Sequence, residues 1–150
     1  MNAAEETKTA IDINTSRFGP VSYTEDKVIS FVHPIPGFER LKKFVLIDHD
    51  KEGRFRWLQS IEDPLVAFLL TSPNFYKPDY SVPLTRMQTD GLGSKDAGQC
   101  ITLVMVCVDQ RTKQVTLNLK GPVMFNPANM RAMQCIVDRE DFDTHHVISQ

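Results

Sequence analysis

The segment VTLNLK, residues 115–120, shows the pattern that decides the fold class of this chain. Apolar and polar residues alternate strictly along it, from Val115 to Lys120. Successive side chains of a β-strand point to opposite faces of a sheet, so this two-residue period predicts a strand with one buried and one solvent-exposed face. Helical periodicity is scarce in the rest of the chain, which favours a β protein.

Short apolar runs recur along the whole chain, separated by nine prolines and seven glycines. Many of these runs are rich in the β-branched and aromatic residues that favour strands. Short strands at such regular spacing predict a mainly β fold, a small antiparallel β-barrel-like single domain with one or two short helical turns. We predict strands at residues 11–14, 19–23, 28–31, 44–48, 55–60, 66–71, 80–84, 100–108, 115–119, 123–125 and 133–137.

Two of the runs, residues 65–70 and 103–108, are apolar on both strand faces. Each needs cover on its second side, either from another segment of the chain or from another protein. Residues 37–44 have the apolar spacing of one or two helical turns, whereas the glycine-rich residues 88–99 predict a surface loop. We expect the polar residues 1–9 to be a disordered leader and residues 10–150 to form the domain.

Length, composition and charge argue against several classes of function. A chain of 150 residues with 41% hydrophobic residues can bury one core without disulfides or metals. The net charge of −2 lacks the basic excess that binding to nucleic-acid phosphates needs. The apolar runs are too short to span a membrane, and the N-terminus lacks the apolar region of a secretory signal. The three cysteines fit reduced thiols, so we predict a cytoplasmic protein. From its charge and its short apolar runs we expect no direct contact with nucleic acid or with a membrane.

The sequence offers little material for a catalytic or metal site. Neither the three cysteines nor the four histidines have the spacing of metal ligands. The motifs of P-loop, dinucleotide-binding, zinc-protease and serine-hydrolase proteins are absent, so we expect no enzyme activity, no cofactor and no metal. Two alternatives stay open. One is a small-molecule-binding or enzymatic β-barrel with a ligand in the barrel mouth near His33, His49 and Asp63, and the other is a direct RNA binder.

Several separated motifs follow one another along the chain: RFGP (17–20), IPGFERLKKFVLI (35–47), RWLQSIEDPLVAFLLTSP (56–73), PDYSVPL (78–84) and TLNLKGPVMFNPANMRAMQCIV (116–137). Their order and spacing resemble those of the FliW family of flagellar assembly factors. The chain departs from the pattern of that family at Phe142 and His145, and its residues 89–98 are longer and richer in glycine. The resemblance implies a small, mostly antiparallel β-barrel-like domain without catalytic activity.

The resemblance also implies two protein partners. One is CsrA, a small RNA-binding repressor of flagellin translation, and the other is flagellin itself. Secreted flagellin leaves a FliW protein free to hold CsrA, whereas flagellin that accumulates in the cytoplasm occupies it and releases the repressor. A mildly acidic domain suits a basic partner, because complementary charge speeds the encounter. We expect this chain to be a monomer when it is free.

A few residues are candidates for partner binding. We predict that the acidic side chains of Asp48, Glu62 and Asp63 face CsrA, and that Phe75 and Tyr76 are apolar anchors. The alternative is that Glu62 and Asp63 form a solvated turn while the two aromatic rings pack within the chain. A helical segment of flagellin would place its apolar stripe in a groove, whose wall is either residues 65–70 or residues 103–108.

Overall fold

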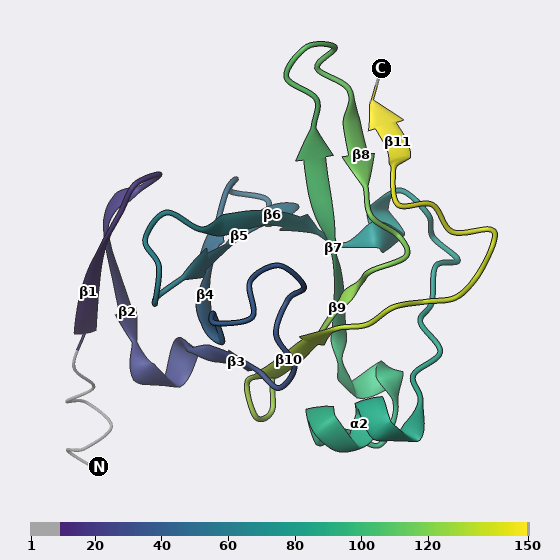
Figure 1. Cartoon of the computed structure of the whole chain (residues 1–150), viewed down its shortest axis with the longest axis horizontal. Helices are drawn as coiled ribbons and strands as arrows, with labels where there is room; N and C mark the ends of the chain where they lie inside the picture. Colours follow the sequence, from purple (N-terminus) through teal and green to yellow (C-terminus); the bar gives the residue numbers. More distant parts are fainter. Residues whose placement is uncertain (1–9, 150) are drawn as a thin grey trace.

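The structure is a computed structural model that describes residues 10–149 (Figure 1). The leader predicted at residues 1–9 lies outside the described residues. Strands dominate, and helical structure is limited to α2 (Arg86–Leu92) and the 3-10 turns Glu25–Lys27, Pro73–Phe75 and Ala97–Gln99 within residues 10–149. The strands are β1 (Ala10–Thr15), β2 (Gly19–Thr24), β3 (Ile29–Phe31), β4 (Lys43–Asp48), β5 (Phe55–Ser60), β6 (Ala67–Thr71), β7 (Ile101–Val108), β8 (Val115–Leu117), β9 (Val123–Asn126), β10 (Arg131–Gln134) and β11 (His146–Ser149).

Seven strands of the described chain close into a barrel. They follow one another in the order β7, β6, β5, β4, β3, β10 and β9, and β9 pairs with β7 to complete the ring. Neighbouring strands run antiparallel except for β3 and β10, which run parallel. Closure leaves no free edge within the ring, which removes a common route to aggregation. The predicted mainly β, barrel-like domain is confirmed.

The long strand β7 connects the barrel to an arm that projects from it (Figure 1). Residues 101–103 pair with β9, residues 104–105 pair with β6, and residues 106–108 pair with β8. Beyond Met105, β7 therefore leaves β6 and continues beside β8, to which β11 adds a further strand. The divergence of β7 from β6 separates two apolar strand faces that would otherwise lie side by side.

Apolar side chains fill the interior of the barrel. The rings of Phe31 and Phe44 meet edge to face with their centroids 5.1 Å apart, and Leu70 is completely buried. A cavity of about 10 Å³ remains between these side chains. The interior is a packed core, and the buried residues that form it are Ile29, Phe31, Ile35, Leu41, Phe44, Leu58, Leu70, Leu103, Val123, Phe125 and Ala132.

A second core lies on the outer side of the barrel, where two long connections cover strands β7, β9 and β10. Val104 and Met124 are completely buried in it. The Tyr80 hydroxyl donates a hydrogen bond to the Leu119 carbonyl oxygen at 2.7 Å, and its ring stacks on Phe142 at 4.8 Å. Burial raises the pKa of the Tyr80 hydroxyl well above its usual value. Leu103 and Met105 pack in the barrel interior, whereas Val104 and Val106 pack in the second core, so segments of this chain cover both faces of residues 103–106. Only the end of the run, Cys107 and Val108, is exposed.

Two of the predicted segments have a different secondary structure. Residues 80–84 form no strand, although Tyr80 and Val82 are buried, because they pack on the second core without a neighbouring strand. Residues 37–42 form tight turns and no helix, and residues 43–44 begin β4. The Phe38 amide donates to the Ile35 carbonyl and the Leu41 amide donates to the Phe38 carbonyl. The apolar spacing there reflects side chains that reach the barrel interior from consecutive turns.

The predicted surface loop at residues 88–99 is wrong at its beginning, because residues 86–92 form helix α2. Thr85 and Gln88 form a reciprocal capping box at its start, and Gly93 ends it in the left-handed conformation with φ of 66°. The completely buried Leu92 anchors the helix, and its carbonyl oxygen accepts a hydrogen bond from Asn126 Nδ2 at 2.8 Å. Strand β11 lies in the C-terminal segment, for which no strand was predicted.

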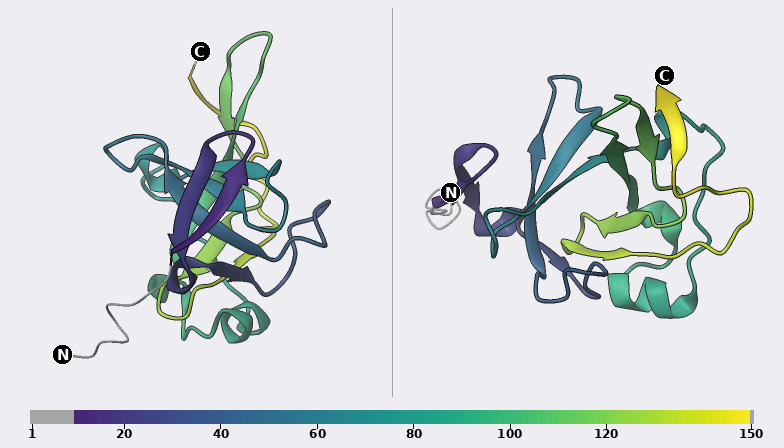
Figure 2. Two further views of the ribbon diagram at one scale, coloured as in Figure 1. Left: turned by 90° about the vertical axis from the view of Figure 1, so that its left-hand side faces the viewer. Right: turned by 45° about the horizontal axis from the view of Figure 1, so that its top comes forward.

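The hairpin formed by β1 and β2 stands beside the barrel and forms a separate two-stranded sheet (Figures 1 and 2). Its turn contacts the outer face of β5. The Ser16 amide donates to the Pro64 carbonyl at 3.2 Å, and the Phe18 ring meets the Trp57 ring edge to face at 5.7 Å. The guanidinium of Arg17 lies over the Trp57 ring, 4.3 Å from its centroid. These contacts place the RFGP motif on the barrel wall.

Candidate protein-binding site

A cleft of about 510 Å³ opens where β7 leaves β6, and we call it the β6–β7 cleft. One side consists of residues 67–69 of β6, and the other consists of residues 105–108 of β7. Sequence reasoning left these two runs as alternative walls of a groove. The structure brings them together as opposite walls of one cleft, whose remaining lining residues are Arg17, Trp57, Gln110, Asn118, Thr144 and His145.

The walls of the cleft combine apolar surface with exposed strand ends. Val108, which lines the β7 wall, is 40% exposed. Exposed aliphatic side chains beside a concave apolar surface are typical of a site that another protein covers. The polar side chains of Gln110, Asn118 and Thr144 surround this surface. The arrangement suits a docked peptide segment better than a small polar substrate.

Trp57 forms a firmly held part of the cleft. Its indole Nε1 donates a hydrogen bond to His49 Nδ1 at 3.1 Å, while Arg17 stacks on one ring face. The Phe18 ring meets the Trp57 ring in an edge-to-face contact. A ring held on several sides loses little conformational entropy when a partner binds, so Trp57 is a good contact surface.

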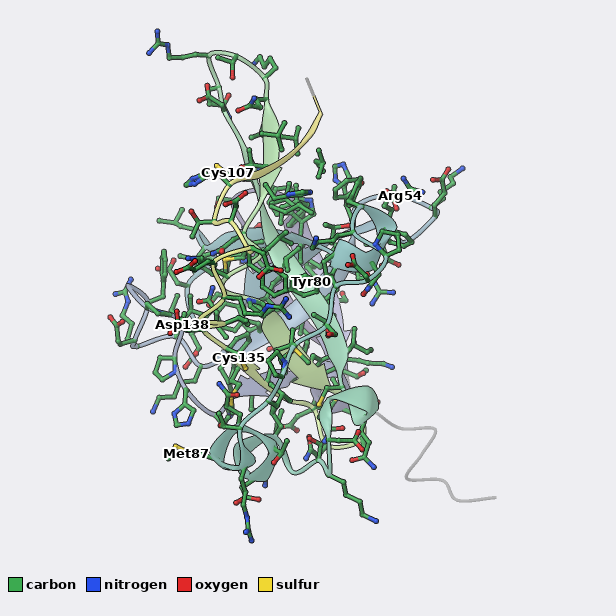
Figure 3. All side chains as sticks on the ribbon, turned by 90° about the vertical axis from the view of Figure 1, so that its right-hand side faces the viewer. Arg54, Tyr80, Met87, Cys107, Cys135 and Asp138 are labelled. Carbon is green, nitrogen blue, oxygen red and sulfur yellow. The ribbon has the colours of Figure 1, made fainter. Side chains whose placement is uncertain are left out.

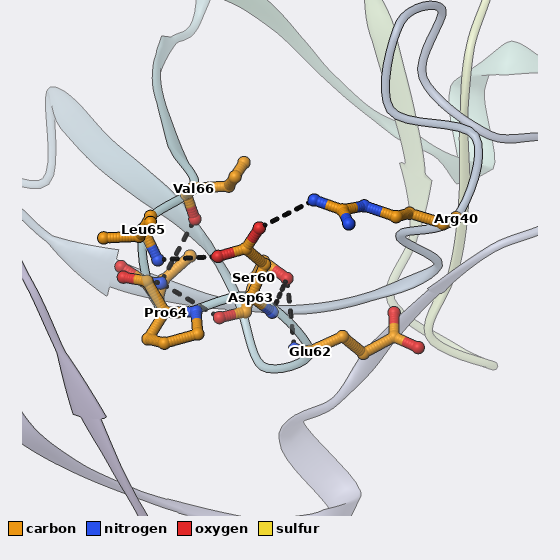
Figure 4. A network of polar contacts seen from close by, with 8 residues as sticks. Arg40, Ser60, Glu62, Asp63, Pro64, Leu65 and Val66 are labelled. Carbon is orange, nitrogen blue, oxygen red and sulfur yellow. Dashed lines mark hydrogen bonds and ion pairs between the residues drawn. The ribbon is translucent and has the colours of Figure 1, made fainter.

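Two of the three acidic residues predicted to face CsrA, Glu62 and Asp63, are engaged within the chain, and Figure 4 shows the contacts of Asp63 with Arg40 and Leu65. Glu62 Oε1 accepts hydrogen bonds from the backbone amides of Lys42 at 2.6 Å and Lys43 at 2.9 Å. Asp63 Oδ1 accepts from the Leu65 amide at 3.0 Å, and its Oδ2 pairs with Arg40 at 3.0 Å. These bonds match the alternative interpretation, in which the two acids build a turn.

The Ser60 hydroxyl tightens the same turn from its buried side. Its Oγ accepts hydrogen bonds from the backbone amides of Glu62 at 3.1 Å and Asp63 at 2.9 Å. Asp48 lies at the opposite end of the β4–β5 pair, where its Oδ1 is 3.4 Å from Arg56 Nε and its side chain is 72% exposed. The three predicted acids therefore do not form one patch, and contact of any of them with a partner stays a prediction.

The two predicted aromatic anchors differ in exposure. Phe75 is 51% exposed, and the guanidinium of Arg54 lies 4.9 Å from its ring centroid. Tyr76 is half-buried and packs against the second core. The two aromatic residues therefore differ in their exposure to solvent. Phe75 is available to a partner, whereas Tyr76 holds the 3-10 turn on the body of the domain.

The three residues that a ligand in the barrel mouth would need do not all converge. His33 follows β3 and Asp63 follows β5, so both lie at the end of the sheet where β4 begins, whereas His49 follows β4 at the opposite end. The interior cavity of about 10 Å³ is far smaller than ligand pockets, which typically measure about 300–1,000 Å³. The filled interior argues against the alternative of a ligand-binding barrel.

The described part of the chain holds no cluster of three or more histidine, cysteine or acidic residues that suits a metal ion. Cys107 is exposed on the arm, whereas Cys135 is buried in the body of the domain (Figure 3). Burial raises the pKa of the Cys135 thiol to about 11, which keeps it protonated and unreactive at neutral pH. No helix among residues 10–149 is long and apolar enough to span a membrane.

Sequence reasoning missed the residues that complete the cleft. Arg17, Trp57 and His145 come from three distant parts of the sequence and meet only after the barrel has closed. The sequence did indicate the walls of the β6–β7 cleft, through the two apolar runs. Each run was too apolar for a strand that has one solvent-exposed face. No comparable local signal marks the polar rim.

Comparisons with known proteins agree with this architecture. The family model described as FliW protein matches residues 12–148. The flagellar assembly factor FliW of Caldanaerobacter subterraneus subsp. tengcongensis is 35% identical over 139 residues, covering 92% of this chain and 93% of that protein. The protein of the same name from Syntrophotalea carbinolica is 37% identical over 131 residues, covering 87% of this chain and 93% of its own length.

A solved structure gives the same result for the fold. The crystal structure of the flagellar assembly factor FliW matches with a TM-score of 0.82 at 28% sequence identity, covering 91% of this chain and 96% of that chain. The region that the family model matches, residues 12–148, includes the barrel, the arm and most of the β1–β2 hairpin. This chain belongs to the FliW family of flagellar assembly factors.

Proposed function

We propose that this chain is a non-enzymatic cytoplasmic regulator of flagellar assembly that binds CsrA and flagellin in alternation. Membership of the FliW family supports the role in flagellar assembly. The observation that carries the mode of action is the β6–β7 cleft, a concave surface that apolar strand residues and polar side chains line together. A cleft of this kind accepts the apolar stripe of an amphipathic helix, in which side chains three or four positions apart share one face.

Flagellin is the partner that we assign to the β6–β7 cleft. The cleft has apolar walls on two strands that meet at an angle, so a helix lying between them contacts both walls at once. Its volume of about 510 Å³ fits the side chains of a helix stripe and leaves the helix backbone outside. Asn118 and Gln110 at the rim can bond to the polar flank of such a helix.

The flagellin assignment is tested by placing a charge in the cleft. Val108→Glu introduces a carboxylate at an exposed wall position and should weaken flagellin binding roughly tenfold or more, because the apolar stripe would meet an unpaired charge. Met87→Glu is the matched control, since Met87 is 77% exposed on α2, far from the arm (Figure 3). Calorimetric titration with purified flagellin measures both. Equal affinities for the two variants rule out the cleft as the flagellin site.

The CsrA assignment needs variants that leave the turn at Glu62 intact. Asp48→Lys reverses a charge that is 72% exposed and makes only a long contact to Arg56. Glu62→Gln removes a charge but keeps an oxygen acceptor for the amides of Lys42 and Lys43. If acidic groups face CsrA, both variants weaken CsrA binding, and the effect shrinks at high salt. Unchanged affinity at low salt excludes these carboxylates from the interface.

The alternation of partners is a separate claim with its own experiment. A preformed complex of this chain with CsrA is titrated with flagellin, and free CsrA is followed by size-exclusion chromatography. Release of CsrA in proportion to added flagellin supports the switch. A stable complex of all three proteins contradicts alternation, and failure of the wild-type chain to bind either protein contradicts the proposed function as a whole.

A further inference from the structure

A groove of about 730 Å³ lies between the β1–β2 hairpin and the barrel, and we call it the β2–β4 groove. Residues 21–24 of β2 form one side, and residues 45–47 of β4 form the other. Among the described residues it has no lining residue in common with the β6–β7 cleft, so it is a separate surface. Its remaining lining residues are Ala10, Lys27, Ile29, Phe125, Pro127 and Met130.

The groove runs along the edges of both strands. Successive side chains of a strand point to opposite faces of a sheet, so a hollow that borders one face contacts alternate residues only. The β2–β4 groove instead contacts four consecutive residues of β2 and three consecutive residues of β4. It therefore follows the strand edges, where the backbone N–H and C=O groups are presented.

The edge of β4 that faces the groove is open beyond Phe44. Neighbouring residues of an antiparallel strand present their N–H and C=O groups to opposite edges in turn. Lys43 faces β5, because its carbonyl accepts a hydrogen bond from the Ile61 amide at 3.1 Å just after that strand. Leu46, three positions further on, therefore presents both backbone groups to the other edge. Within residues 10–149, β3 pairs with β4 at Lys43 and Phe44 and does not reach Leu46.

Strand β2 presents the second open edge. It pairs with β1 on one side, and in the described part of the chain these two strands form a sheet of their own. The hairpin stands beside the barrel, so β2 and β4 flank the groove without pairing with each other (Figure 1). Two open edges that border one groove suit an additional strand, because its own N–H and C=O groups then find partners on both sides.

The side chains of the groove add apolar contacts and one charge. Val45 is 2% exposed, and Ile29 and Phe125 belong to the packed barrel interior, so a side chain that enters the groove contacts the core. Lys27 is the one charged residue among the described lining residues. It is exposed and forms no ion pair within residues 10–149, which favours an acidic group on the ligand.

We propose that the β2–β4 groove binds an extended segment of another protein as an added β-strand. The segment forms backbone hydrogen bonds with Leu46 of β4 on one edge and with β2 on the other. Its alternate apolar side chains pack on Val45, Ile29 and Phe125, and an acidic side chain pairs with Lys27. A helix bonds its own backbone groups and would leave both open edges unpaired, so the occupant is a strand. This surface goes beyond the proposed binding of CsrA and flagellin.

Hydrogen exchange of the free full chain tests whether the edge of β4 is open. The Leu46 amide should exchange on the order of tenfold faster than the amide of Val45, which faces β5 and pairs opposite Gln59. Equal protection of the two amides in dilute solution means that this chain already covers its own edge. Protection of Leu46 that appears only at high protein concentration means that a second copy covers it. Either result overturns the inference.

A short peptide tests strand addition directly. The acetylated peptide amide Thr-Val-Thr-Val-Thr-Val-Glu alternates apolar and polar side chains and carries one carboxylate. It should bind saturably and slow the exchange of the Leu46 amide. Two N-methylated versions, one methylated on the valine nitrogens and one on the threonine nitrogens, keep every side chain, and each loses the donors of one edge. Each should bind on the order of tenfold more weakly. Full affinity of both methylated peptides overturns the inference.

A charge exchange tests the role of Lys27. Lys27→Glu should weaken binding of the acidic peptide, and replacing the glutamate of the peptide by lysine should restore it. Arg111→Glu is the matched control, since it reverses an exposed charge in the β7–β8 turn at the tip of the arm and should change neither affinity. Equal binding of both peptides to both variants removes the ion pair and overturns the inference. Because the groove and the cleft are separate surfaces, failure of these peptides leaves the flagellin site standing, and failure of the Val108→Glu test leaves this inference standing.

Discussion

Truncation of Leu70 gives the most direct test of the packed barrel interior. Leu70 is completely buried in the middle of β6, and it pairs with Arg56 of β5 on one side and Met105 of β7 on the other. The adjacent cavity measures only about 10 Å³, so Leu70→Ala creates new empty space. Strands that are paired on both sides cannot move together to fill it. We therefore expect a loss near the upper end of the usual range, about 4 kcal/mol of unfolding free energy.

The assay is urea unfolding followed by circular dichroism, together with a thermal scan. A loss of this size should lower the melting temperature by about 8–16 °C in a domain of this length. Leu65→Ala is the matched control, because the same side chain is removed at a position that is 77% exposed, and it should change stability by less than about 0.5 kcal/mol. A loss below about 1.5 kcal/mol at Leu70 would show that the interior is not packed as described.

Three further variants or reactions test other parts of the structure. Glu62→Ala should destabilise the fold by about 1–2 kcal/mol in urea unfolding, and Glu62→Gln by clearly less, because only alanine removes the acceptor for two backbone amides; equal losses contradict this role. Tyr80→Phe should cost about 1–2 kcal/mol, since the buried Leu119 carbonyl loses its donor, and a neutral result means that water replaces the hydroxyl. At pH 8, Ellman's reagent should modify the exposed Cys107 rapidly and Cys135, with a pKa raised to about 11 by burial, only after unfolding; rapid modification of Cys135 in the folded protein refutes its burial.

The burial of Cys135 also has a consequence at alkaline pH. Its thiol pKa rises from 9.0 in the unfolded chain to about 11 in the folded chain, so the folded state favours the protonated form. The associated stability is fully present below pH 9 and is lost as the pH rises toward 11. This loss adds to any other alkaline transition. The difference in unfolding free energy between the wild-type chain and a Cys135→Ala variant, measured between these two pH values, isolates it.

Much of the strand pattern was predictable because local chemistry determines it. The runs that became β4, β5 and β6 are apolar or β-branched segments bounded by turn residues, and their predicted bounds differ from the observed ones by one residue at most. Helix α2 was missed because its sequence, RMQTDGL, contains few apolar residues. Its capping box and the docking of Leu92 stabilise it, and the second of these exists only in the folded domain.

The candidate site was predictable in part. The apolar runs 65–70 and 103–108 were both identified as faces that need cover, but their sequences do not reveal that they face each other across one cleft. That arrangement follows from β7, which changes neighbours from β6 to β8 beyond Met105. The sequence also left two roles open for Glu62. Its carboxylate accepts hydrogen bonds from backbone amides that lie about twenty residues away in the chain, so no local pattern could choose between the roles.

The sequence by itself determined the class of the protein, its family motifs and the short-range pattern of strands and turns, because residue type and periodicity act over a few neighbouring positions. The tertiary structure decided which apolar faces are buried and which remain open. It also decided that Arg17, Trp57 and Gln59 meet beside the cleft. Such meetings depend on barrel closure and strand register, which are set by the sum of many long-range contacts and leave no mark on any one segment.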